Sequence, residues 1–573
     1  MMCESRKTFK SKLKWCQTNK QQIQLDIIAT HHSQKEFSSF WKHTKKLNPK
    51  PSVPISVEGL NDPKQIAEMF VEHFKVQPSL SSVASNNSQQ CYPGDLTSSP
   101  VLITAGEIRS VLRKMTRGKS PGHDHLSIEH LLFAGSHLPR VLALFYSLCM
   151  SHEYLPDNML KTMVVPIIKN KTGNSSEKSN YRPISLATIL AKVLDRLLDQ
   201  QLRKHIKLHD AQFGFRPGLS TETAILCLKQ TVQYYTSRST PVYALFLDLS
   251  KAFDSVQYDV LWEKLLKETD VPNDYINILK YWYLNQRNYV KWAGEHSDMY
   301  GLQCGVRQGG VSSTTLFNLY MNELIVELSG AEVGCSIDGT LINNISYADD
   351  MVLLSPSISA LKKLITICEH YVEAHGLRYN VSKSELLVFK AKNKTYSVPM
   401  IKINGTPLKQ VQSFRYLGHW VTESLKDDLD IERERRALCI RANMLSRRFV
   451  RCTKNVKVTL FKAYCHSLYT CSLWTNYTQR SYGVLRTQYN NAFRGLMGLP
   501  RHCSASGMLA AAEVDSLSAI IRKRVASLLQ RVRGSANSLL KAVVARLGAD
   551  SAIMQHWTRV HLVKDTKINY NNF

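Results

Sequence analysis

The sequence lacks long hydrophobic runs, closely spaced cysteine pairs and a secretory signal. Its longest apolar stretches, such as residues 141–146, are far shorter than the ~20 residues that a membrane-spanning helix needs, so we expect no membrane protein. Its 13 cysteines include no C-x-x-C pair, which disfavours a zinc site or a disulfide framework and favours reduced thiols in an intracellular protein. Residues 1–20 are polar and basic, without the apolar core of a signal peptide.

Acidic side chains are scarce, and the resulting positive charge lies at the two ends of the chain. The 573 residues include 74 Lys and Arg against 46 Asp and Glu, a formal charge of +28. Residues 1–60 carry a net charge of +7 and residues 441–573 carry +17, whereas residues 61–440 carry only +4. Such a surplus points to a polyanionic partner, because Lys and Arg neutralise phosphates. The length predicts about three to five domains, and 44% hydrophobic residues exclude a disordered chain.

The first hundred residues are expected to be an extension and a linker. Residues 1–77 are predicted to be basic and helical, and Pro63 is placed at the first position of a helix, where proline is favoured. Residues 78–100 are rich in Ser, Asn and Gln and are predicted to be a linker. Order is expected to resume at a capping box that Thr104 and Glu107 form at the start of the next helix.

From residue 425 onward the pattern is almost wholly helical. Ile431, Leu438 and Leu445 recur every seven residues, so we expect them in a core. Arginines lie between these residues. The helix faces that carry the arginines either contact phosphates or are the ordinary solvated faces of a helical bundle. These arginines are Arg433, Arg435, Arg436, Arg441, Arg447 and Arg448.

Two segments place carboxylates where a strand ends. Residues 242–248 form an apolar run that ends in Asp248, and residues 343–354 indicate two strands joined by a turn that contains Asp349 and Asp350. Adjacent aspartates suit a turn on structural grounds alone. At the rim of a core, however, their like charges are costly unless a cation compensates them. If the strands pair, three carboxylates meet, and such hard oxygen ligands select Mg²⁺.

Five motifs, in this order along the chain, resemble those of a reverse transcriptase from the non-LTR (LINE-type) retrotransposon branch. The fingers motifs are N-Y-R-P-I-S-L at 180–186 and Q-F-G-F-R-P at 212–217, and the palm motifs are F-L-D-L-S-K-A-F-D at 246–254, G-V-R-Q-G-G at 305–310 and Y-A-D-D at 347–350. The similarity covers about residues 100–450. It implies an α+β, right-hand polymerase.

The resemblance also implies domains, an activity and partners. Fingers are expected at 101–240, a palm with an antiparallel sheet at 241–424, and a helical thumb with a basic C-terminal region at 425–573. The implied activity is RNA-directed DNA synthesis by two-metal nucleotidyl transfer. The implied partners are an RNA template, a DNA primer or target and dNTPs, with no membrane and with the oligomeric state left open. The family resemblance indicates the nucleus as the location.

The metal-site roles transfer residue by residue. Asp248, Asp349 and Asp350 match the carboxylates that bind two Mg²⁺ ions, with Mn²⁺ as an alternative ion, and Leu249 would add a backbone carbonyl. Lys383, in the motif G-L-R-Y-N-V-S-K, matches the lysine that protonates the pyrophosphate leaving group.

Other positions match substrate contacts of the family. Arg182 and Lys169 would grip the triphosphate, and Gln308 and Gly309 would approach the nascent base pair. Phe253 would lie under the sugar and clash with a 2′-hydroxyl, which favours DNA synthesis. Asp254, whose spacing puts it off the strand tip, is interpreted as a structural or helix-start residue. The primer grip is expected in the hairpin residues Phe414, Tyr416, Leu417 and Gly418.

Neighbouring activities of the family are not expected here. The polymerase motifs begin too early to leave room for a preceding endonuclease, no zinc knuckle is evident, and residues 441–573 hold too few acids for RNase H. We therefore expect polymerisation without cleavage, from a truncated copy or a fragment of a longer frame. Two alternatives stay open: an RNA-copying or maturase-like palm polymerase, which Phe253 disfavours, and an inactive nucleic-acid-binding descendant, which the intact Asp248, Asp349 and Asp350 disfavour.

Overall fold

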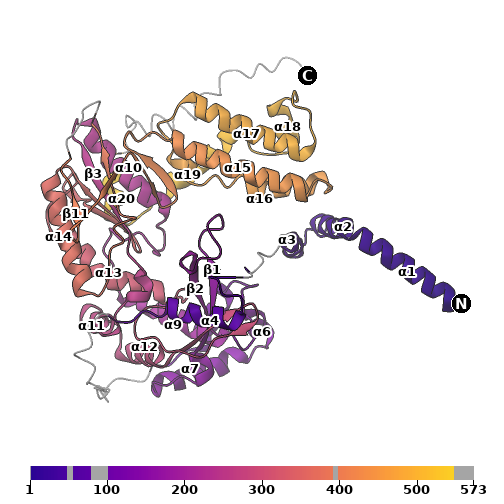
Figure 1. Cartoon of the computed structure of the whole chain (residues 1–573), viewed down its shortest axis with the longest axis horizontal. Helices are drawn as coiled ribbons and strands as arrows, with labels where there is room; N and C mark the ends of the chain where they lie inside the picture. Colours follow the sequence, from indigo (N-terminus) through magenta and orange to yellow (C-terminus); the bar gives the residue numbers. More distant parts are fainter. Residues whose placement is uncertain (1, 48–53, 55, 79–100, 392–397, 547–573) are drawn as a thin grey trace. The chain divides into compact units, whose positions relative to one another are not determined.

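The computed structural model describes residues 2–47, 54, 56–78, 101–391 and 398–546 (Figure 1). The chain divides into two compact units. The sheet unit comprises Val53–Ala224 and Thr231–Val411, and the helical unit comprises Met1–Ser52, Ile225–Gln230 and Gln412–Phe573. The expected α+β class is confirmed. Apart from Pro78, the predicted linker lies outside the described residues, and the predicted domain boundaries stay predictions.

A five-stranded, mainly antiparallel sheet forms one centre of the sheet unit. Its order is β13 (Lys409–Val411), β10 (Glu385–Phe389), β3 (Val242–Leu247), β9 (Asp350–Ser355) and β8 (Asn344–Tyr347). The central strand β3 pairs antiparallel with both β10 and β9, and all six of its side chains are buried. A strand buried on both faces is uniformly apolar, which explains the run that the sequence shows.

Helices cover this sheet and complete its core. Among them α13 (Ser313–Gly330) packs against β8, and α14 (Ile358–Ala374) packs against β9. Helix α11 (Tyr258–Glu268) packs in turn on α13. The unit also contains two short two-stranded sheets, in which β6 (Ser336–Ile337) pairs with β7 (Thr340–Leu341) and β11 (Lys402–Ile403) pairs with β12 (Thr406–Pro407).

A second sheet has the order β2 (Tyr181–Leu186), β1 (Lys161–Ile168), β4 (Arg287–Trp292) and β5 (Glu295–His296). Helix α4 (Pro63–Phe74) packs on β4, where the ring of Phe70 lies against the rings of Tyr181 and Trp292. The start of α4 at Pro63 confirms the prediction.

The remaining helices of the sheet unit follow the sequence pattern. The capping box of Thr104 and Glu107 begins α5, as predicted. These helices are α5 (Ala105–Lys114), α6 (Ile128–Phe133), α7 (Leu138–Ser151), α8 (Asp157–Leu160), α9 (Ile189–His205), α10 (Thr221–Ser237, of which residues 225–230 count with the helical unit) and α12 (Asn273–Asn285).

The helical unit contains one hairpin and is otherwise helical in its described residues, as expected. Its hairpin pairs β14 (Ser413–Tyr416) with β15 (His419–Thr422). Ile431, Leu438 and Leu445 are buried, which confirms the seven-residue series. Its helices are α1 (Met2–Thr18), α2 (Lys20–Ser33), α3 (Phe37–Lys46), α15 (Asp428–Arg448), α16 (Lys454–Cys465), α17 (Gln479–Met497), α18 (Ala505–Ala511), α19 (Leu517–Arg533) and α20 (Ser538–Ala545). Among the described residues, no helix has both the length and the apolar character to cross a bilayer.

Most arginines of α15 bind carboxylates of the same helix. The sequence left open whether they contact phosphates or solvent, and the structure shows that at least four of them form ion pairs within the protein. The ion pairs are Arg433 with Asp430 and Glu434, Arg435 and Arg436 with Glu432, and Arg441 with Glu434. The alternating acids of this helix therefore neutralise much of its basic face.

Asp430 is the centre of a buried polar network behind the β14–β15 hairpin. Its side chain is fully buried and accepts hydrogen bonds from Arg433 Nε at 2.7 Å and Trp474 Nε1 at 2.8 Å. His419 Nδ1, on β15, lies 3.1 Å from the carboxylate. Burial opposes ionisation, but the hydrogen bonds from His419 and Arg433 hold the pKa of Asp430 below its usual range.

Replacing Asp430 by asparagine should destabilise the protein strongly. Removing one partner of a buried ion pair leaves the other charge uncompensated, so we expect a loss of about 3 kcal/mol in the free energy of unfolding. Glu432→Gln is the control, because its partly exposed pairs should contribute less than about 1 kcal/mol. Urea unfolding of both variants measures the difference, and equal losses would contradict the role of Asp430.

Candidate active site

Three carboxylates gather where β3 ends and the β8–β9 turn begins. Leu247 pairs with Met351, so Asp248 follows β3 at the same end of the sheet at which Asp350 begins β9. Asp349 lies in the turn that precedes Asp350. The sequence predicted this convergence from the strand pattern, and the register of the strands provides it.

The electrostatics of the three carboxylates show that they are close enough to interact. Burial, and then the neighbouring charge of Asp248, raises the pKa of Asp349. Burial, and then the charges of Asp349 and Asp248, raises the pKa of Asp350 to about 7. Among the described residues, no group of three or more His, Cys, Asp or Glu side chains is arranged to hold a metal ion. The chemistry of the donors nevertheless fits a hard divalent cation, because acceptor-only oxygens repel one another until a cation compensates them.

The raised pKa of Asp350 predicts how stability depends on pH without divalent ions. A carboxyl whose pKa rises from 3.8 to about 7 on folding binds a proton more tightly in the folded state. Stability therefore falls as pH rises between these values, and Asp350→Asn should remove that part of the loss. Thermal unfolding in EDTA at several pH values tests this prediction. The melting temperature of the variant, relative to that of the wild type, should increase as pH rises from 4 to 8. A constant difference would contradict it.

The predicted triphosphate ligands Arg182 and Lys169 lie near each other and near Lys383. Arg182 belongs to β2, and Lys169 follows the end of β1 and donates through Nζ to the carbonyl of Ser179. Burial, and then the charges of Arg182 and Lys383, lowers the pKa of Lys169. Lys383 Nζ lies 3.4 Å from Asp248 Oδ2. Burial raises the pKa values of Asp349 and Asp350, and the charges of Arg182 and Lys383 oppose part of that rise. Lys169 lies close enough to both cations for their charges to act on it. The three cations form a cluster suited to a polyanion.

Lys251 is a neighbour that the sequence analysis missed. Its backbone is left-handed, with φ of +48°, and its ammonium donates to the carbonyl of His73 at the end of α4. Burial, and then the charge of Lys251, lowers the pKa of His73 to about 4. The motif at 246–254 contains Lys251, but no local signal indicates a partner so far away in the sequence.

Phe253 is held by other aromatic rings. It stacks on Phe317 of α13, with ring centroids 4.4 Å apart and planes 12° apart. Phe215 meets Phe253 edge-on at 6.5 Å and lies 6.4 Å from the ring of Tyr347. Phe215 has a φ of +58° and is 44% exposed, a position that the sequence analysis did not assign. The predicted sugar-facing ring therefore has a rigid support.

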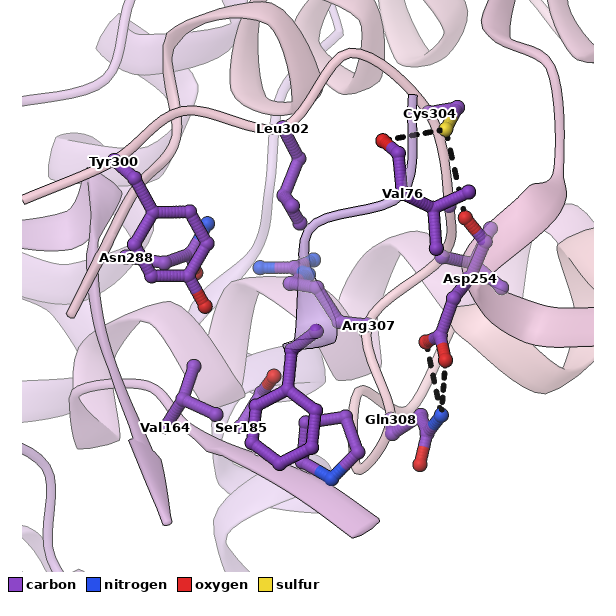
Figure 2. Close-up of a pocket in the computed structure, with 14 residues that line it drawn as sticks. Val76, Val164, Ser185, Asp254, Asn288, Tyr300, Leu302, Cys304, Arg307 and Gln308 are labelled. Carbon is purple, nitrogen blue, oxygen red and sulfur yellow. Dashed lines mark hydrogen bonds between the residues drawn. The ribbon is translucent and has the colours of Figure 1, made fainter. Parts of the chain in front are cut away.

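Gln308 is fixed by Asp254, as Figure 2 shows. The amide nitrogen of Gln308 lies 2.8 and 3.0 Å from the two carboxylate oxygens of Asp254, and burial raises the pKa of Asp254 to about 6. Gly305 has a φ of +94°, and a Cβ there would lie 2.8 Å from the carbonyl oxygen of Asp254. Because the carboxylate holds the amide nitrogen, the amide oxygen of Gln308 points away from it. This structural role of Asp254 agrees with its interpretation from the sequence.

The backbone around the site is tied together by close contacts. Gly309 has a φ of +111°, and a Cβ there would lie 3.2 Å from the carbonyl of Ser185. The amide of Ser185 donates to the carbonyl of Gln308. On the other side, the amide of Asn380 donates to the carbonyl of Asp248, and Leu249 bridges to Tyr379. Contact of the Leu249 carbonyl with a metal stays a prediction.

The predicted primer-grip residues form a tight hairpin in the helical unit. Leu417 and Gly418 occupy the two-residue turn with φ of +46° and +84°, the signs that such hairpins require. Tyr469 donates from its hydroxyl to the carbonyl of Leu417. Phe414 and Tyr416 lie on β14, where Tyr416 is buried. Contact with a primer stays a prediction.

A family model supports the interpretation of the motifs. Residues 168–421 match the family described as "Reverse transcriptase (RNA-dependent DNA polymerase)". This range contains every predicted nucleotide and metal contact, together with the hairpin.

The chain is similar to curated proteins of mobile elements. It is 25% identical to the "Probable RNA-directed DNA polymerase from transposon BS" of Drosophila melanogaster, over 81% of this chain and 53% of that protein. It is 25% identical to the "RNA-directed DNA polymerase from mobile element jockey" of the same fly, over 55% of this chain and 35% of that protein. A retrovirus-related Pol polyprotein from a type-1 retrotransposable element R2 of Popillia japonica is also 25% identical, over 52% and 42%. The chain spans about half the length, or less, of these relatives.

Solved structures show a distant likeness. The apo telomerase of Candida tropicalis aligns with a TM-score of 0.36 and 12% identity, over 70% of this chain and 69% of that one. A telomerase of Candida albicans aligns with a TM-score of 0.32 and 11% identity, over 71% and 69%.

Proposed function

We propose that this chain, which carries a reverse transcriptase domain at residues 168–421, is the RNA-directed DNA polymerase of a non-LTR retroelement. It would extend a DNA primer with dNTPs on an RNA template. The observation that carries the proposal is the convergence of Asp248, Asp349 and Asp350 at one end of the five-stranded sheet, where the charges of Arg182 and Lys383 act on Asp349 and Asp350. Carboxylates beside cations suit the transfer of a nucleotidyl group from a dNTP to the primer hydroxyl, with pyrophosphate as the leaving group.

The three carboxylates would hold two Mg²⁺ ions, or Mn²⁺ in their place, with the carbonyl of Leu249 as a further ligand. Bound ions would activate the primer hydroxyl and stabilise the leaving oxygen of an in-line displacement. The mutual repulsion of Asp248, Asp349 and Asp350 supports this assignment, because a cation relieves it.

Arg182 and Lys169 would bind the phosphates of the nucleotide, and Lys383 would protonate the leaving group. Arg182 offers a planar guanidinium that suits bidentate contact with phosphate oxygens, and Lys169 adds a second charge. Lys383 would hold the proton for the pyrophosphate leaving oxygen at its Nζ. Its ion pair with Asp248 keeps the ammonium at the site before the nucleotide arrives.

The neutral residues would orient the nucleotide and the primer. Phe253, backed by Phe317, would exclude a 2′-hydroxyl, and Gln308 with Gly309 would lie at the nascent base pair. The hairpin with Phe414, Tyr416, Leu417 and Gly418 would contact the primer end.

The proposal extends to domains and location. Fingers, palm and thumb are assigned to 101–240, 241–424 and 425–573, and the nucleus is proposed as the location, because a DNA target of a retroelement lies there.

Primer extension tests the function directly. Purified protein with Mg²⁺, dNTPs and a primed RNA should extend the primer, and Asp349→Ala, folded to the same extent, should not. If the folded wild type incorporates nothing, the proposal is wrong. Preferential use of rNTPs would support an RNA-copying enzyme instead, and salt-sensitive binding without extension would support an inactive nucleic-acid-binding protein.

A further inference from the structure

A segment far from the catalytic turn in the sequence lies directly beside it. The amide of Phe213 donates to the carbonyl of Ser346 at 2.7 Å, and the amide of Ser346 donates to the carbonyl of Ala211 at 2.8 Å. Gln212 thus forms a parallel bridge with Ser346, a residue of β8. The loop before α10 therefore runs along the strand that leads into Asp349.

The side chain of Gln212 reaches the turn itself. Its amide oxygen accepts hydrogen bonds from the amides of Ala348 and Gly214, both at 2.9 Å. Ala348 directly precedes Asp349 and has a φ of +58°, a left-handed conformation that disfavours any residue with a Cβ. A strained backbone next to a functional residue persists only where its surroundings hold it. The hydrogen bond from the Ala348 amide to Gln212 stabilises this left-handed backbone.

The environment of Gln212 indicates that its hydrogen bond to Ala348 supports the turn that contains Asp349. The residue has no exposed surface, and its amide nitrogen has no hydrogen-bond partner among the described residues. A buried donor without a partner opposes folding, so an apolar side chain of the same size would suit a purely structural position better. Gly214 adds a second constraint, because a Cβ there would lie 2.4 Å from the amide nitrogen of Ala348.

We infer that Gln212 is a positioning residue, which holds Ala348 in its left-handed conformation and thereby aims Asp349 at the reacting phosphate. The inference rests on the proposed polymerase function. Gln212 touches no reacting group, and it acts through the backbone of Ala348. Its contribution should appear in kcat and in metal affinity, and only weakly in the KM for dNTPs.

The test uses Gln212→Met in the full chain, because methionine keeps the size and removes the acceptor. We expect kcat in primer extension to fall by about 100-fold, as misplacement by about 1 Å does in other enzymes, with KM nearly unchanged. Mn²⁺ binding, followed by electron paramagnetic resonance without substrate, should weaken as well. Gln201→Met, at a half-exposed position on α9, is the matched control and should match the wild type.

A second substitution separates positioning from general damage. Glycine adopts a left-handed backbone without support, so adding Ala348→Gly to Gln212→Met should recover about tenfold in kcat. General damage to packing would not be repaired in this way. If Gln212→Met does not fold, Gln212→Asn replaces it, since its shorter amide cannot reach Ala348.

The outcomes distinguish this inference from the proposed function. An active wild type with unchanged kcat and Mn²⁺ affinity in the Gln212 variant overturns the inference, and so does a loss that Ala348→Gly fails to repair. An inactive wild type overturns the proposed function, while the Mn²⁺ titration still decides whether Gln212 positions the turn.

Discussion

Replacing Asp349 by asparagine should lower kcat for primer extension by about a thousand-fold or more, because a metal-ion site contributes several kcal/mol of transition-state stabilisation. Asparagine keeps the shape of the turn but removes the charge that would hold the cations. Burial and the charge of Asp248 raise the pKa of Asp349, so its ionised form is under repulsion in the metal-free protein. The variant should therefore melt at the same temperature as the wild type, or above it.

Asp259→Asn is the matched control for Asp349→Asn. Asp259 is an exposed carboxylate in the first turn of α11, and its loss should leave extension intact. Single-turnover primer extension and thermal unfolding of both variants give the comparison. Retained activity in Asp349→Asn would show that the carboxylates at the end of β3 and β9 are not the reaction centre.

Phe253→Ala should raise the use of rNTPs relative to dNTPs by about 100-fold, the upper range for discrimination by a single steric contact. The stack on Phe317 prevents the ring of Phe253 from moving aside, so the wild type should reject a 2′-hydroxyl firmly. Removal of the ring opens the space. The ratio of kcat/KM for the two nucleotides, each measured by primer extension, reports the change.

Phe133→Ala, a substitution of a phenylalanine that is 75% exposed, controls for the loss of a ring. It should leave the nucleotide preference unchanged. Equal use of rNTPs and dNTPs by the wild type would contradict the assignment of Phe253 and would favour the RNA-copying alternative.

The sequence predicts the parts of the site that depend on local pattern. The buried run of β3, the turn at Asp349 and the two-residue hairpin at Gly418 each follow from periodicity and turn chemistry within a few residues. The convergence of Asp248 with Asp350 requires one further step, the pairing of β3 with β9. That step follows from the hydrophobic pattern, because both strands must be buried.

The supports of the site are not predictable in this way. Gln212 and Ala348 are 136 residues apart, and the Lys251 ammonium reaches a carbonyl 178 residues away. Phe215 lies in a motif that resembles one of the reverse transcriptases, yet no periodicity indicates that its ring meets Phe253. Such contacts arise from the three-dimensional path of the chain, so a sequence alone identifies the reacting groups better than the groups that hold them.

The ion pairs of α15 change what the net charge of the chain implies for binding. A lysine or arginine that already binds a carboxylate is partly neutralised. Its contact with a phosphate therefore releases fewer counterions from a nucleic acid than the contact of an unpaired side chain would. Four arginines of α15 are in this position. The slope of affinity against salt concentration should consequently report fewer phosphate contacts than the count of basic residues in this part of the chain suggests.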